Sequence, residues 1–206
     1  RLLLGRVPVP SRALVATGTL KGFLDTRAGQ ALARQLREDT QSYLELAFDL
    51  VAVGFLSEAL DLLGQAKKAC RKSPALGLVD YSRGWILDQL GRKGRAHRAF
   101  AAGAKADRTY AFPFRLEEEA ILKTALEYDR KDAVAWHYLA ILRGAQARFE
   151  EARDAWQRAI QLGLKDPVAC FGLGKIHETI FNDADAAKKR FEAGLALDPN
   201  DTHIRG

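Results

Sequence analysis

The chain has 206 residues, of which 48% are hydrophobic and 28% charged, and its formal net charge is +6. These proportions are typical of a folded protein and argue against disorder. No apolar run approaches the roughly 18 residues of a membrane-spanning helix. Because the sequence contains no Met and no secretory leader pattern, we expect it to be an internal or C-terminal piece of a longer polypeptide.

Residues 1–39 are predicted to form an N-terminal lead-in that is partly irregular and then helical. Pro8 and Pro10 interrupt regular structure near its start. A short helix is predicted over residues 11–16, and a second over residues 28–38.

Two helices joined by a turn are predicted between residues 40 and 73. Gly54 lies in the turn, and Ser73 with Pro74 is expected to cap and start the next helix. The side chains that face one another across this pair are Tyr43, Leu46 and Ala47 on the first helix and Ala59, Leu63 and Ala66 on the second.

A second pair of helices follows, with Gly91 in its turn. The residues expected where its two helices touch are the small Gly84, Ala96 and Gly103 and the bulky Phe100. Asp80 and Arg83 stand where apolar residues are expected, and we therefore expect this first helix to be rotated or shifted in register.

An insertion over residues 110–131 separates the second pair of helices from the third pair of helices. It contains the sequence FPFR at residues 112–115 and then a predicted helix that begins at Leu116. Its predicted buried face consists of Leu116, Ala120, Ile121 or Leu122, Ala125 and Tyr128. Residues 117–119 are three glutamates, which we interpret as a solvated first turn that favours the helix dipole.

The third and fourth pairs are predicted over residues 132–201, with residues 202–206 as a truncated tail. Asp132 is expected to cap the third pair, Gly163 to end it in the left-handed conformation, and Asp166 with Pro167 to open the fourth. The contact positions are Trp136, Leu139, Ala140, Arg143, Ala152, Trp156 and Ala159 in the third pair and Leu173, Gly174, Ala187, Phe191 and Gly194 in the fourth.

These positions resemble the signature of the tetratricopeptide repeat (TPR). The resemblance implies an all-α, TPR-type α-solenoid of about four helix-turn-helix repeats, paired as residues 40–109 and 132–201, with an inserted helix between the second and third. The second-helix alanines at positions 59, 96, 152 and 187 are separated by 37, 56 and 35 residues, and the long middle interval locates the insertion.

FPFRLEE at residues 112–118 and TQSYLELAF at residues 40–48 resemble the C-terminal repeat region of large bacterial proteins of the DUF5107 family. The resemblance covers roughly residues 30–200. It implies a β-rich domain, similar to carbohydrate-active or mutarotase-like folds, upstream of these repeats. Any catalytic residues would then lie in that domain.

The residue types that carry chemistry are not arranged as a catalytic or metal site. Cys70 and Cys170 lie too far apart in the sequence for a zinc motif and are interpreted as buried apolar residues. The four histidines lack metal-ligand spacing and are expected at the surface or in interhelical hydrogen bonds: His97, His137, His177 and His203. We therefore expect no cofactor and no enzymatic activity in this chain.

The expected place for function is the concave face formed by the first helices of the repeats. The predicted binding residues are Gln41, Leu44, Phe48, Tyr81, Trp85, His137, Ile141, Phe171 and Lys175. Aromatic groups with a few polar neighbours suit an extended peptide, a protein partner or the upstream domain of the same polypeptide. The same residues could instead pack against the inserted helix or that domain. Neither nucleic acid nor membrane is an expected partner, and a cytoplasmic location is favoured.

Overall fold

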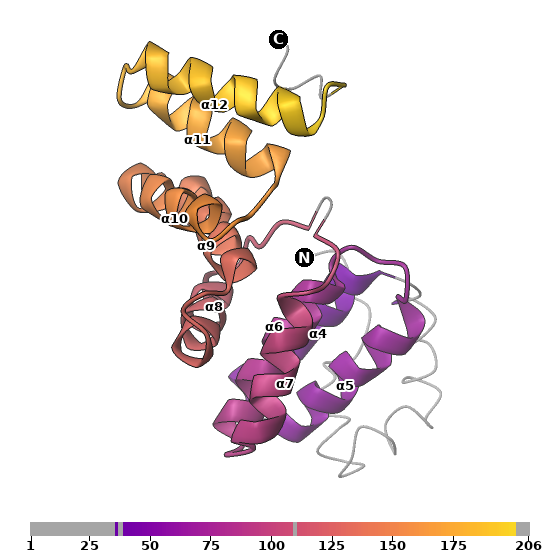
Figure 1. Ribbon diagram of the computed structural model, residues 1–206. Coiled ribbons are helices and arrows are strands. Elements are labelled where there is room, and N and C mark those ends of the chain that lie inside the picture. Colours follow the sequence, from indigo (N-terminus) through magenta and orange to yellow (C-terminus); the bar gives the residue numbers. More distant parts are fainter. Residues whose placement is uncertain (1–35, 37–38, 109–110, 201–206) are drawn as a thin grey trace, which may run out of the picture. The chain divides into compact units, whose positions relative to one another are not determined.

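The computed structural model describes Leu36, residues 39–108 and residues 111–200, and these ranges contain nine α-helices and no strand. The chain divides into two compact units, Arg1–Ala111 and Phe112–Gly206 (Figure 1). The helices predicted over residues 11–16 and 28–38, His203 and the tail lie outside the described residues, apart from the helical Leu36.

The described residues of unit 1 form two antiparallel helix hairpins. Helix α4 (Thr40–Ala52) pairs with α5 (Leu56–Ala69), and α6 (Leu76–Gln89) pairs with α7 (Lys93–Gly103) (Figure 1). Gly54 and Gly91 lie in the two turns, as predicted, and their φ of 85° and 70° is a left-handed backbone that glycine adopts without strain.

Small residues let the paired helices of unit 1 approach closely. Ala59, Ala66 and Ala96 are completely buried. A Cβ added to Gly84 would lie 2.5 Å from Cδ1 of Phe100, so the Phe100 ring packs directly on the α6 backbone. Two of the predicted contact positions of this helix pair, Gly84 and Phe100, therefore meet.

The expected rotation of α6 is wrong, because Asp80 is accommodated by charge pairing. The Asp80 side chain is buried and accepts hydrogen bonds from Lys67 Nζ at 2.6 and 2.7 Å. Arg83 Nη1 lies 3.5 Å from the same carboxylate. A buried carboxylate is tolerated only when it is paired, and Lys67 supplies that partner from the preceding hairpin.

The start of α6 also differs from the prediction. The helix begins at Leu76, and neither Ser73 nor Pro74 occupies its first turn. The hydroxyl of Ser73 accepts from the Ala75 amide at 3.2 Å, which forms a local turn before the helix.

Unit 2 begins with α8 (Leu116–Tyr128), which precedes two hairpins. Helix α9 (Ala133–Ala145) pairs with α10 (Phe149–Gln161), and α11 (Pro167–Thr179) pairs with α12 (Ala184–Leu197) (Figure 1). Asp132 and Asp166 cap α9 and α11 through hydrogen bonds from backbone amides, and Pro167 starts α11, all as predicted. Gly163 adopts a φ of 93°, as predicted.

The predicted buried face of α8 is correct at Ile121, Leu122 and Ala125 but wrong at Leu116, Ala120 and Tyr128. Leu116 is 73% exposed, Ala120 is exposed and Tyr128 is half-buried. The face that is buried consists of Glu118, Ile121, Leu122, Ala125 and Leu126. These positions follow the i, i+3, i+4, i+7, i+8 pattern of a helix packed on one side, so the helix exists as predicted but presents a neighbouring stripe.

Candidate functional site

The predicted binding residues are divided between the two units and differ in accessibility. Four of them are buried within the described structure, with exposed fractions of 5% or less: Leu44, Phe48, Tyr81 and His137. Gln41, Trp85, Ile141 and Phe171 are half-buried, and Lys175 is exposed. A ligand can therefore reach only the second group in this conformation.

His137 is held inside unit 2 by a neighbouring helix. Its Nδ1 accepts a hydrogen bond from Nε1 of Trp156 at 3.2 Å, which links α9 to α10. This contact is the interhelical role expected for a histidine of this kind. His97 is exposed on α7, and His177 is half-buried with its Nδ1 3.9 Å from Asp183 Oδ2.

Helix α11 keeps one stripe of its surface accessible. Val168 is 36% exposed, Phe171 is half-buried and Lys175 is exposed. Their spacing of three and four residues places them on one face of the helix. The remaining faces are largely packed, since the buried residues of α11 are Ala169, Cys170, Leu173, Gly174 and Ile176.

The stripe is mainly apolar, with charge at one end. The Phe171 ring packs against Phe191 of α12, with ring centroids 6.1 Å apart, and this contact holds it in place on the side facing α12. Lys175 Nζ donates to Glu178 Oε2 at 2.5 Å on the same helix. This arrangement suits a partner that buries apolar side chains and hydrogen-bonds at the Lys175 end.

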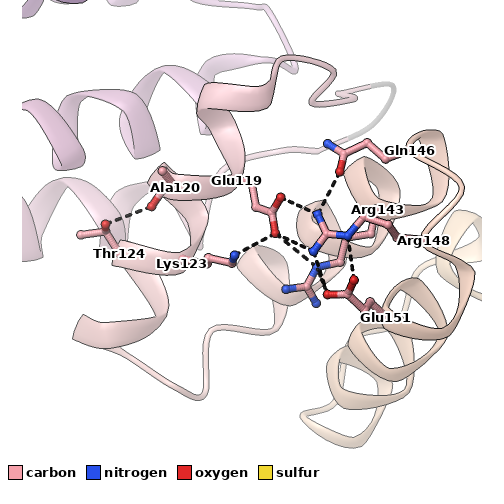
Figure 2. A network of polar contacts seen from close by, with 8 residues as sticks. All are labelled: Glu119, Ala120, Lys123, Thr124, Arg143, Gln146, Arg148 and Glu151. Carbon is pink, nitrogen blue, oxygen red and sulfur yellow. Dashed lines mark hydrogen bonds and ion pairs between the residues drawn. The ribbon is translucent and has the colours of Figure 1, made fainter.

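Figure 2 shows a network of ionic contacts that the sequence interpretation missed. Glu119 of α8 accepts from both terminal nitrogens of Arg148, at 2.6 and 3.1 Å, and pairs with Lys123 at 2.9 Å. Arg148 in turn pairs with Glu151 of α10 at 2.7 Å. The network ties the inserted helix to the following hairpin, which is a structural role.

The interpretation of residues 117–119 as a solvated turn is correct only for Glu117. Hydrogen bonds from Arg148, together with Lys123, hold the pKa of Glu119 at about 2. Glu118 is 4% exposed, and burial raises its pKa although it accepts from the Phe114 and Arg115 amides at 2.8 and 2.9 Å. The side chain of Glu117 is half exposed.

A small cavity lies in unit 2 beside this network. Its volume is about 260 Å³, and it is lined by Ala147, Arg148, Phe149, Glu150, Glu151 and Ile180. Its charged groups include Arg148 and Glu151, which pair with one another, and Glu150, and the rest of the lining is apolar. No nucleophile or proton-transfer pair faces into it.

The described residues hold no metal-ligand cluster and no membrane-spanning helix. In residues 39–108 and 111–200, no three His, Cys, Asp or Glu side chains gather closely enough to hold a metal ion. Cys70 and Cys170 are free and buried, as predicted. Among the helices described, none combines the length and apolar character needed to cross a bilayer.

The fold and the contacts between paired helices define the class of protein to which the described residues belong. Each unit stacks two TPR-type helix hairpins, with α8 added at the start of unit 2, so the part of the chain that the structure describes is an all-α helical-repeat protein. No known family profile matches the sequence, and no curated protein matches it.

Similar solved structures are TPR and related proteins at low identity. They include MamA from Desulfovibrio magneticus RS-1 (20% identity, 79% of this chain and 97% of that chain, TM-score 0.37). YrrB, described as a TPR protein with an unusual peptide-binding site, is 16% identical over 85% of this chain and 95% of its own, with a TM-score of 0.40. TTC0263, a TPR protein of Thermus thermophilus, is 18% identical over 81% and 95%, with a TM-score of 0.39.

Proposed function

We propose that this chain is a non-catalytic scaffold that binds a protein or an extended peptide on the accessible stripe of α11. The observation that carries the proposal is the stripe of Val168, Phe171 and Lys175 on a helix whose other faces are largely packed. An apolar stripe that remains accessible in a folded repeat is a recognised kind of interaction surface.

The neighbouring first helix limits where the partner lies. On α9, Val134 and His137 are buried, whereas Ile141 is half-buried. Contact with α9 is therefore expected only towards its C-terminal half. The residues predicted in unit 1 contribute Gln41 and Trp85 as a separate, smaller accessible set.

A peptide-display selection on the folded chain, followed by affinity measurement of the selected peptides, tests the proposal. V168D and K175E change the stripe without removing a buried side chain, and each is expected to weaken binding about tenfold. L197D is the matched control, because Leu197 on α12 is an apolar residue of similar exposure (42%, against 36% for Val168). Equal losses in V168D and L197D, or no selected peptide at all, would contradict the proposal.

The alternative is that these repeats form an accessory C-terminal region of a larger carbohydrate-active protein of the DUF5107 family. Its first support is the resemblance of residues 40–48 and 112–118 to that repeat region. A second is that Phe112, Phe114 and Leu116, in the distinctive segment at residues 112–116, are exposed and so accessible to another domain. Sequencing the gene on both sides of this stretch tests the idea. An upstream reading frame without a β-rich domain would overturn it.

A further inference from the structure

Helix α7 differs from the other second helices in the sign of its charges. Within the described residues, the second helices each mix acidic and basic residues except α7, which carries cations alone. Helix α5 contains Glu58 and Asp61, and α12 contains Asp185 and Glu192. On α10, Arg148 and Glu151 neutralise each other at its start.

The cations of α7 and its ends are exposed and mostly unpaired. Arg92, Arg95, Arg98 and Lys105 are all exposed, and among residues 39–108 and 111–200 no carboxylate pairs with them. Lys93 is the exception, since its Nζ lies 2.6 Å from Asp88 Oδ1. Arg92 is the N-cap residue and Lys105 lies just past the last helical residue, Gly103, so these cations extend over the whole of α7, about 16 Å at 1.5 Å per residue.

The position of the cations at the start of α7 does not favour the helix. Arg92, Lys93 and Arg95 lie at the N-terminal end, where the helix dipole disfavours positive charge, and this end has no acidic residue and no side-chain cap. The small residues Gly94 and Ala101 between the cations are also exposed, and the bulkier exposed neighbour on this helix is His97.

We propose that this outer face of α7 (Arg92, Arg95, Arg98 and Lys105, hereafter the basic face) binds an acidic protein segment, separately from the stripe on α11. Charge complementarity supports a chain of glutamates or aspartates, because guanidinium groups form paired hydrogen bonds with carboxylates. Single-stranded nucleic acid fits less well, since Phe100 of α7 is 3% exposed and only the small imidazole of His97 remains exposed on this helix for stacking against a base.

The test is fluorescence anisotropy with a labelled glutamate-rich peptide and the full chain. R95E/R98E is expected to weaken binding at least about tenfold, and wild-type binding is expected to weaken as salt rises from about 50 mM to 200 mM. The variant relieves charge repulsion at a helix start, so thermal unfolding is expected to show no loss of stability.

The matched control is K68E/K72E, which lowers the net charge equally at exposed positions in the same unit. It is expected to bind the peptide nearly as well as the wild type. Equal losses in both double variants would show attraction by net charge alone and overturn the proposal. An absence of peptide binding, or tighter binding of oligo-dT at the basic face, would overturn it as well.

Discussion

Nε1 of Trp156 donates a hydrogen bond to Nδ1 of His137 at 3.2 Å, and both side chains are buried. The same indole lies against α11, because a Cβ built on Gly172 would come 2.3 Å from its Cη2 atom. One tryptophan on α10 therefore contacts the helix before it and the helix after it, and it connects the two hairpins of unit 2.

The first prediction concerns the indole. W156F removes the donor to His137 and part of the ring, and we expect it to lower the free energy of unfolding by about 2–3 kcal/mol. W136F is the control, because Trp136 is half-buried and its Nε1 donates to the exposed Arg130 carbonyl. Urea denaturation followed by circular dichroism measures both. Equal losses of unfolding free energy in W156F and W136F would contradict the conclusion that Trp156 connects the two hairpins.

The second prediction concerns the close approach at Gly172. G172A forces the indole or the helix to move, and we expect a loss of about 1–3 kcal/mol in unfolding free energy. G144A serves as the control, since its Cβ would meet Trp156 at an ordinary 3.8 Å. The control is expected to be neutral or stabilising by about 0.5–1 kcal/mol. A tolerated G172A, in the same denaturation assay, would argue against the packing described.

The third prediction concerns the turn between α9 and α10. Ala147 adopts a φ of 59°, where a side chain is strained, whereas the turns in unit 1 have glycine at the left-handed position. We expect A147G to raise the unfolding free energy by about 0.5–1 kcal/mol. Glycine removes the strain in the folded state, and this gain is partly offset because glycine also increases the conformational entropy of the unfolded chain. G163A is expected to lower the unfolding free energy, because Gly163 has a φ of 93°, which strains any residue with a side chain. A lower melting temperature for A147G would refute this explanation.

The fourth prediction concerns pH and the network in Figure 2. Glu119 has a pKa of about 2 in the folded protein, against an ordinary value of 4.5, because Arg148 and Lys123 favour its charged form. A depressed acid pKa stabilises the fold above about pH 4.5, and this stabilisation is lost as the pH falls towards 2. E119Q is therefore expected to cost roughly 1–2 kcal/mol at pH 7 and progressively less below pH 4.5.

The matched control for this pH dependence is E117Q, since the Glu117 side chain is half exposed and pairs only locally with Arg115. Its effect is expected to be within about 0.5 kcal/mol across the same range. Thermal melts of both variants and the wild type between pH 7 and 2.5 supply the comparison. A stability difference for E119Q that does not change with pH would contradict the charge pairing.

The sequence predicted the repeat contacts well because they depend on local spacing. The small residues that let helices approach lie at predicted contact positions: Gly84 meets Phe100, and Ala152 is completely buried. The caps at Asp132 and Asp166 were predictable for the same reason, since each involves amides two or three residues away.

Features that depend on distant residues could not be predicted in this way. Glu119 pairs with Arg148, 29 residues further along, and nothing near the three glutamates indicates that contact. The same limit applies to Asp80, which is matched by Lys67 from another hairpin. Repeat numbering also placed Leu44, Tyr81 and His137 in the groove, but local spacing does not reveal which neighbours bury them.

Hydroxyl-radical footprinting of the chain with and without a selected peptide tests the central proposal most directly, because it reports side-chain accessibility. Binding on the accessible stripe of α11 predicts protection of Val168 and Phe171, with Leu197 on α12 unchanged. Protection of Leu197 with Val168 and Phe171 unaffected would contradict the proposed binding surface.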